Sequence, residues 1–343
     1  MQQRQSGLDL IRVTGFFLVT LFHAFLYNGY YGQPQVGFAM WSAGVARSLS
    51  MACNGLFMTL TGYLHYGKRS LSGAVRGLGP VLLGYALAAA FSIPVRHFLL
   101  GQQESLSVWV TRFFGFRGVY YGWYVEMYIG LALLSPFLNR LLEALPDREL
   151  CLLTLVLLFL TAVPGATPMV LAPAYWVNAY PLLYYVLGAA IRRFQPKIPT
   201  WAGLTGALGI AVILGTCTVL STDGNLDDAL IWQFGDLWVA GMVVCLFLAL
   251  YRLRSGKALS KLLTFGAGGC FGGYLLSNLP DAWCYQACPW HDPKDYWKQV
   301  LFVTVPIWLC SMAAGHGLEA LCRRICRRKR HNNAEKRGRQ CIK

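Results

Sequence analysis

Charged residues are scarce in this chain. Only 13% of its 343 residues are charged and 56% are hydrophobic, whereas about 25% of the residues in a typical soluble domain are charged. So few charges cannot cover a surface that faces water. The composition therefore excludes a soluble enzyme, a coiled coil and a disordered protein.

Linkers are also lacking, because no stretch rich in proline, serine or glycine and no long charged segment divides the chain. Instead there are ten apolar segments of roughly 20 residues, the length that crosses a bilayer as a helix. We predict an all-α integral membrane protein with about ten transmembrane helices, a single domain over residues 1–321 and a basic tail over residues 322–343. The predicted spans are residues 8–29, 41–64, 75–99, 118–138, 150–170, 175–191, 200–220, 231–251, 260–280 and 297–320.

Acidic residues are fewer than basic ones, 15 against 30, and the basic residues gather in alternate loops. Loops rich in lysine and arginine stay in the cytoplasm. The alternation predicts cytoplasmic N- and C-termini and a location in the cytoplasmic membrane, with the lipid bilayer as partner. The basic run at residues 323–330 is typical of an anchor near anionic lipid, and we expect no nucleic acid partner.

The first span carries three ionisable side chains, which are costly in a membrane and therefore indicate function. Arg12 and His23 lie eleven residues apart, so they share one helix face about 16 Å apart along the axis. Asp9 precedes Arg12 by three residues, the spacing of a helical ion pair. An interfacial ion pair and a packing histidine are the alternative, but the alignment of all three favours an acid–base site. These polar residues also fit a signal peptide badly.

The same helix resembles the first helix of the acyltransferase-3 family of membrane proteins. There, as at residues 9–23 of this chain, an Asp-Leu-Ile sequence leads into an arginine that precedes a histidine by eleven positions. Further stretches resemble family motifs in the family's order, so the resemblance covers residues 7–320. They are Asn54–Leu64, Trp123–Tyr124 with Leu133–Leu138, Tyr184–Gly188 and Phe271–Leu276.

The resemblance implies transfer of an acyl group, most often acetyl, from cytoplasmic acetyl-CoA to a hydroxyl of a cell-surface glycan or lipid-linked sugar. His23 matches the histidine taken as catalytic in the family, and would deprotonate the acceptor hydroxyl or carry the acyl group itself. Asp9 would hold Arg12 in place. Basic side chains suit phosphate by charge and donor geometry, and the candidates for the CoA phosphates are Arg12, Lys68, Arg69 and Arg76.

The chain departs from the family's motifs at three places. Tyr121 and Ser277 each stand where the family often has a histidine. The basic pair that precedes a proline in the first cytoplasmic loop is displaced, because Ala74 and Gly77 occupy its positions before Pro80. The first two departures affect the acceptor side, and the third leaves the CoA contact open among the displaced basic residues.

Several other residues are candidates for the acceptor side. Glu126 would orient His23 or bind a sugar hydroxyl, or it forms an interhelical hydrogen bond in its neutral form. Arg47 and Asp236 each lie about one turn into a span and could line the acceptor entrance, although interfacial snorkelling explains Arg47 equally well. The candidate substrate-binding residues are therefore Arg47, Trp123, Tyr121 and Asp236.

Cysteine usage adds little. Cys284 and Cys288 share the last outer loop, where a disulfide is one option, and His291 lies nearby. We expect no metal site.

A transporter for a small solute is the alternative function, since transporters also bury ionisable groups. Many transporters are built from two halves with paired broken helices, and no repeat at half the length is visible here. This absence weighs against a transporter.

Overall fold

The computed structural model describes residues 5–34, 36–166, 173–221, 235–288 and 295–340, and these contain helices but no strand. The all-α prediction is confirmed for this part of the chain. Short 3₁₀ helices lie at η1 (Tyr30–Gly32), η2 (Tyr120–Gly122) and η3 (Ala174–Ala179), and a π-helical stretch, Val300–Thr304, joins α13 to α14. The α-helices are α1 (Ser6–Tyr27), α2 (Gly37–Ser50), α3 (Ala52–His65), α4 (Leu71–Phe98), α5 (Leu106–Phe114), α6 (Trp123–Ala144), α7 (Asp147–Ala166), α8 (Tyr180–Phe194), α9 (Thr200–Ser221), α10 (Leu237–Leu250), α11 (Lys257–Leu276), α12 (Asn278–Ala287), α13 (Tyr296–Gln299) and α14 (Val305–Gln340).

Each predicted span overlaps a helix, but the span expected at residues 260–280 is interrupted at Ser277, and the span expected at residues 41–64 is wrong as a single helix. It is divided at Met51, whose amide donates a hydrogen bond to the Ser48 carbonyl at 3.2 Å instead of continuing the α-helical pattern. The Ser50 hydroxyl also donates to the Arg47 carbonyl at 2.6 Å, the kind of local side-chain bond that competes with a regular helix.

Five helical segments among the described residues are both long and apolar enough to cross a membrane. The span count of about ten and the sidedness of the termini stay predictions. The five segments are Ser6–Tyr27, Leu71–Phe98, Tyr120–Ala144, Thr200–Leu220 and Tyr296–Arg327.

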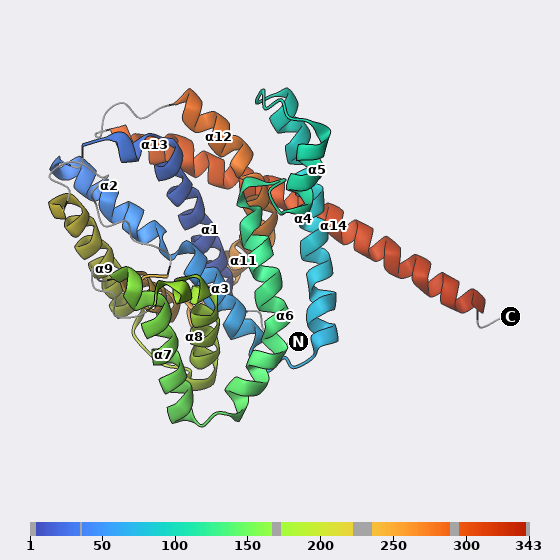
Figure 1. The fold of residues 1–343 in the computed structure, drawn as a ribbon, viewed down its shortest axis with the longest axis horizontal. Helices are drawn as coiled ribbons and strands as arrows, with labels where there is room; N and C mark the ends of the chain where they lie inside the picture. The colour runs from blue at the N-terminus through green and yellow to red at the C-terminus, as the bar shows by residue number, and fades with distance from the viewer. Residues whose placement is uncertain (1–4, 35, 167–172, 222–234, 289–294, 341–343) are drawn as a thin grey trace.

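Two helices, α1 and α3, organise the middle of the bundle (Figure 1). α1 packs against α11 and α3, while α3 packs against α8 and α10. α3 and α8 approach closely because both have glycine where they cross. A Cβ atom on Gly62 would collide with the Tyr185 carbonyl, and one on Gly188 would collide with the Thr59 carbonyl. Small residues of this kind are typical of close helix packing in membranes.

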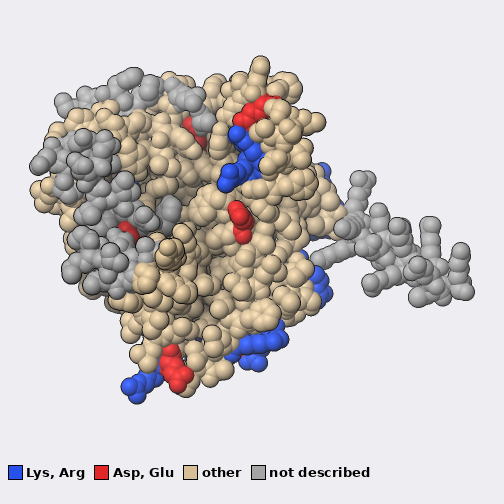
Figure 2. Space-filling view, viewed as in Figure 1, with Lys and Arg blue, Asp and Glu red and all other residues tan. Residues whose placement is uncertain are grey.

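The loops predicted to be cytoplasmic meet at one end of the molecule, which we call the basic end. Lys and Arg side chains lie along the lower edge in Figure 2. Hydrogen bonds tie these loops together, for example from Arg193 Nη1 to the Leu145 carbonyl at 2.9 Å and from Ser6 Oγ to the Leu253 carbonyl at 3.0 Å. The sequence separation of the partners shows that the bundle itself brings the basic loops to one end.

The C-terminal helix α14 continues through residue 322 without a break and leaves the helical body (Figure 1). Cys322 is buried, so the start of the tail is part of a packed helix, and the division of domains at residue 321 stays a prediction. Cys284 and Cys288 are free thiols in the structure. The loop at residues 222–234 and His291 lie outside the described residues.

Candidate active site

His23 lies between an aromatic ring and a carboxylate in the middle of the bundle. Its ring stacks on the Tyr121 ring, with centroids 3.9 Å apart and an interplanar angle of 6°. Tyr121 donates a hydrogen bond from its hydroxyl to Asp281 Oδ2 at 2.6 Å, and the same Oδ2 lies 3.8 Å from His23 Nδ1. His23 Nδ1 is buried and forms no hydrogen bond with any of the described residues. Buried polar atoms are normally paired, and the polar atom nearest to this nitrogen is Asp281 Oδ2.

The three side chains come from three separate elements. His23 lies in the last turns of α1, Tyr121 in η2 and Asp281 in the first turn of α12. Tyr274 of α11 joins them, because its hydroxyl donates to the Tyr121 carbonyl at 2.8 Å. The order of elements along the chain therefore gives no hint that these residues meet.

Asp281 belongs to this cluster but is not among the residues predicted from the sequence. The predicted ninth span ends at residue 280, which placed Asp281 in a loop, but the chain turns at Ser277 and enters α12. The side chain is fully buried. A carboxylate directly after an apolar span, with the Leu279-Pro280 step before it, was the available signal, because Pro is favoured in the first turn of a helix.

Two cavities meet beside this site. The His23 cavity has a volume of about 280 Å³ and the Arg12 cavity about 300 Å³, and Asn54 and Tyr274 line both. Asn54 is buried in α3. Asn54 is the first residue of the stretch Asn54–Leu64, which resembles a family motif.

Each of these cavities shares lining residues with a further one. The Arg12 cavity shares His65 and Tyr128 with a loop cavity of about 490 Å³ at the basic end. The His23 cavity shares Tyr120 and Trp123 with a distal cavity of about 610 Å³ at the opposite end. A series of neighbouring cavities with shared wall residues, which we call the cavity path, thus leads from the basic end past Arg12 and His23 to the distal end.

Arg12 is positioned by Asp9, as the spacing predicts. Arg12 Nη1 lies 2.6 Å from Asp9 Oδ1, and Thr264 of α11 donates to Asp9 Oδ2 at 3.0 Å. Asp9 is fully buried, whereas 27% of the Arg12 side chain is exposed. Asp9 precedes His23 by 14 residues, about 21 Å along the helix. Asp9 therefore acts on Arg12 and lies far from His23.

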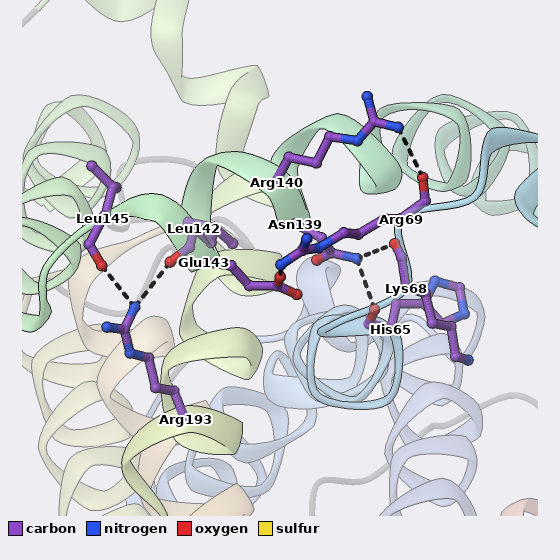
Figure 3. A network of polar contacts seen from close by, with 9 residues as sticks. All are labelled: His65, Lys68, Arg69, Asn139, Arg140, Leu142, Glu143, Leu145 and Arg193. Atoms are coloured by element: carbon purple, nitrogen blue, oxygen red, sulfur yellow. Dashed lines mark hydrogen bonds and ion pairs between the residues drawn. The ribbon is translucent and has the colours of Figure 1, made fainter.

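The α3–α4 loop is held by one amide side chain, shown in Figure 3. Asn139 of α6 donates from Nδ2 to the carbonyls of His65 and Lys68, both at 2.7 Å, and its Oδ1 accepts from the Tyr185 hydroxyl at 2.9 Å. Asn139 is fully buried. The backbone of this loop is therefore fixed from within the bundle.

The predicted CoA-binding residues divide into two groups around this loop. Lys68 and Arg69 line the loop cavity, and Arg69 forms an ion pair with Glu143. Arg76 is exposed and its guanidinium contacts Ser72 within its own helix, and it is not among the residues that line the loop cavity. The structure thus brings Lys68 and Arg69, rather than Arg76, toward the path that leads to Arg12.

The predicted acceptor residues are also divided. Tyr121 and Trp123 line the His23 cavity, and Glu126 is exposed and lines the distal cavity. Glu126 does not line the cavity of His23, where Asp281 stands instead. Arg47 Nε donates to the Tyr31 hydroxyl at 3.2 Å, and Asp236 is buried at the start of α10. Neither Arg47 nor Asp236 lines the His23 or the distal cavity.

The helical fold, with segments apolar enough to cross a membrane and a buried imidazole beside a cavity, defines a class, the helical integral membrane proteins with an ionisable group inside the bundle. Comparison with protein families identifies the member of this class. The family model described as Acyltransferase domain, of the acyltransferase-3 type, matches residues 5–315. The chain belongs to the acyltransferase-3 family and is a membrane acyltransferase, and membership of this family does not favour the transporter alternative. No curated protein and no solved structure matches the chain.

Proposed function

We propose that the protein transfers an acetyl group from acetyl-CoA, bound from the basic end, to a hydroxyl of a cell-surface glycan or lipid-linked sugar. The observation that carries the proposal is the buried imidazole of His23, whose Nδ1 faces Asp281 Oδ2 at 3.8 Å and which lines a cavity that shares Asn54 and Tyr274 with the Arg12 cavity. A general base must reach the proton that it removes. A buried imidazole between a donor path and an acceptor path meets this need.

The donor side is supported by the charges along the path. Lys68 and Arg69 at the loop cavity and Arg12 deeper in the bundle offer cationic donors at two depths. Guanidinium and ammonium groups suit the phosphates of CoA. The acyl-bearing arm would pass Arg12 toward His23, about 16 Å further along α1.

The chemistry follows from the position of His23. The imidazole takes the proton of the acceptor hydroxyl while the oxygen of that hydroxyl attacks the thioester carbonyl. The carbon–sulfur bond then breaks, the CoA thiolate leaves and the proton passes to it, so that the products are the acetyl ester and CoA. Attack by the imidazole itself, followed by transfer to the hydroxyl, gives the same products, and both routes need the same nitrogen.

Tyr121 and Asp281 act as positioning residues in this proposal. Stacking on Tyr121 fixes the plane of the His23 ring, and Asp281 faces its Nδ1 edge. The distance of 3.8 Å exceeds that of a hydrogen bond, and catalytic contacts often tighten only when substrate binds. A carboxylate here stabilises the imidazolium that forms when His23 accepts a proton.

The decisive experiment compares surface glycans of cells with and without this protein by mass spectrometry. Cells that contain the protein should carry one additional acetyl group per glycan repeat, and cells with the His23→Ala variant should lack it at equal membrane content of the protein. Unchanged glycans in all three strains would refute the proposal. We place the protein in the cytoplasmic membrane, which fractionation of the same cells tests.

A further inference from the structure

The distal cavity holds a buried arginine whose charge no carboxylate compensates among the described residues. Arg96 is 0% exposed and belongs to the last turn of α4. Its Nε donates to Gln102 Oε1 at 2.9 Å and its Nη1 lies 3.4 Å from the Gly118 carbonyl, so both partners are neutral. Buried charges in proteins are almost always paired. The positive charge of Arg96 is therefore suited to bind an anionic group of a ligand.

Aromatic rings hold the Arg96 guanidinium in place at the cavity wall. Its carbon lies 3.9 Å from the Tyr120 ring centroid and 5.1 Å from that of Trp109. Gln102 connects Arg96 to Tyr120, because it accepts a hydrogen bond from Arg96 Nε and donates one to the Tyr120 hydroxyl, both at 2.9 Å. A guanidinium that is stacked and hydrogen-bonded presents its remaining N–H groups in one orientation.

The cavity around Arg96 has an excess of positive charge. Three arginines and two glutamates line it, and one arginine is neutralised because Arg112 lies 2.6 Å from Glu104. Arg117 is exposed and forms no ion pair among the described residues, and the same holds for Glu126. Figure 2 shows basic and acidic side chains grouped over this part of the molecule.

The aromatic residues Tyr120 and Trp123 line both the distal cavity and the His23 cavity. A ligand that places an anionic group at Arg96 and Arg117 can therefore lay its body on these rings. Glu126 can accept hydrogen bonds from hydroxyl groups on that body. Stacking surfaces, a hydrogen-bond acceptor and an arginine fork together match an acidic sugar.

We propose that the distal cavity is a binding subsite for an acceptor sugar that carries a carboxylate or phosphate group. Arg96 and Arg117 bind the acidic group, Tyr120 and Trp123 support the ring, and a hydroxyl of the ring or of its neighbour extends toward His23. The statement that the bound sugar receives the acetyl group rests on the proposed function. The recognition of the acidic group by Arg96 and Arg117 is independent of it.

The test measures binding without acetyl-CoA, using the full chain in nanodiscs of phosphatidylcholine, which has no net charge. Galacturonic acid, galactose 6-phosphate and galactose share one ring stereochemistry and differ in charge. Dissociation constants from saturation-transfer NMR should be about tenfold lower for one or both acidic sugars than for galactose. The acidic sugar that binds more tightly identifies carboxylate or phosphate as the preferred group.

Arg117→Gln should reduce this preference about fivefold, because it removes an exposed cation. Arg148→Gln, which removes an exposed cation at the start of α7, serves as the matched control and should leave it unchanged. Arg96→Lys keeps the charge and loses the fork, and should also lower the preference if it folds. Equal binding of all three sugars, or an unchanged preference in Arg117→Gln, would overturn the inference.

The two proposals fail separately. Acidic sugars that bind through Arg117 but never receive acetyl would refute the proposed function and leave this subsite in place. Acetyl transfer that depends on His23, to sugars whose binding does not change in Arg117→Gln, would refute the subsite and support the proposed function.

Discussion

The cationic side chains at the two ends of the cavity path differ in how they are exposed and held. At the basic end the protein fixes the backbone of the α3–α4 loop through Asn139 and leaves cationic side chains exposed, with 60% of the Arg69 side chain accessible. At the distal end it buries and stacks the Arg96 side chain itself. Exposed charges attract any polyphosphate loosely, whereas a fixed guanidinium selects one geometry. On the proposed function, the difference predicts a permissive donor entrance and a selective acceptor site.

The largest effect should come from the residue between the two ends. His23→Ala should lower acetyl transfer by roughly 10³-fold, because general acid–base groups contribute about 10²–10⁴. Turnover of labelled acetyl-CoA by purified protein measures this, with gel filtration as the check on folding. A single-turnover experiment without acceptor extends the result, because label retained on wild-type protein but not on His23→Ala would indicate an acyl-histidine. Activity within a few-fold of wild type would remove His23 from the mechanism.

A smaller loss is expected from Asp281→Asn, which removes the carboxyl group that would carry a negative charge 3.8 Å from Nδ1 of a protonated His23. Hydrogen bonds to charged groups contribute about 1.5–3 kcal/mol, so kcat should fall about 10- to 100-fold while KM for acetyl-CoA stays constant. Asp281→Glu should restore part of the loss. The control is Ser277→Ala, whose buried hydroxyl bonds only to the Tyr274 carbonyl of its own turn. A rise in KM with unchanged kcat would contradict a positioning role.

Asn139→Ala tests whether the basic end depends on a fixed backbone. The variant leaves the carbonyls of His65 and Lys68 without their donor, so the free energy of unfolding should fall by about 1–3 kcal/mol. KM for acetyl-CoA should rise more than kcat falls. Tyr185→Phe removes only one of the three hydrogen bonds of Asn139 and should cost less. Steady-state kinetics and thermal unfolding of both variants provide the comparison.

The smallest effect should follow from Arg69→Gln. An exposed ion pair contributes about 0.2–1 kcal/mol, so KM for acetyl-CoA should rise by a factor of about 2 to 5. The difference from wild type should shrink near 0.5 M salt, where screening acts within a few Å. Acidic-sugar binding through buried Arg96 should keep more of its strength at the same salt. Equal salt sensitivity at the two ends would break the contrast between them.

Much of this arrangement could be predicted from the residues of one helix. Asp9, Arg12 and His23 share a face because 3.6 residues make a turn, and their sequence spacing alone gives the ion pair and the axial distance. The clustering of basic loops at one end follows from charge alternation. Asp281 could not be assigned in this way, because its role depends on how α12 turns back toward α1 and η2. Arg47 and Asp236 were placed near the acceptor by depth alone, and depth does not determine which cavity a side chain reaches.

The helices α3, α8 and α10 are short compared with the thickness of a bilayer. They have 14, 15 and 14 residues, and at 1.5 Å per residue they are about 21–23 Å long. The hydrocarbon core of a bilayer is about 30 Å thick. Short transmembrane helices thin the bilayer around them, and here α3 packs against both α8 and α10. On the proposed function, the acetyl group that passes Arg12 travels beside helices about 21–23 Å long, less than the ~30 Å of a bilayer core.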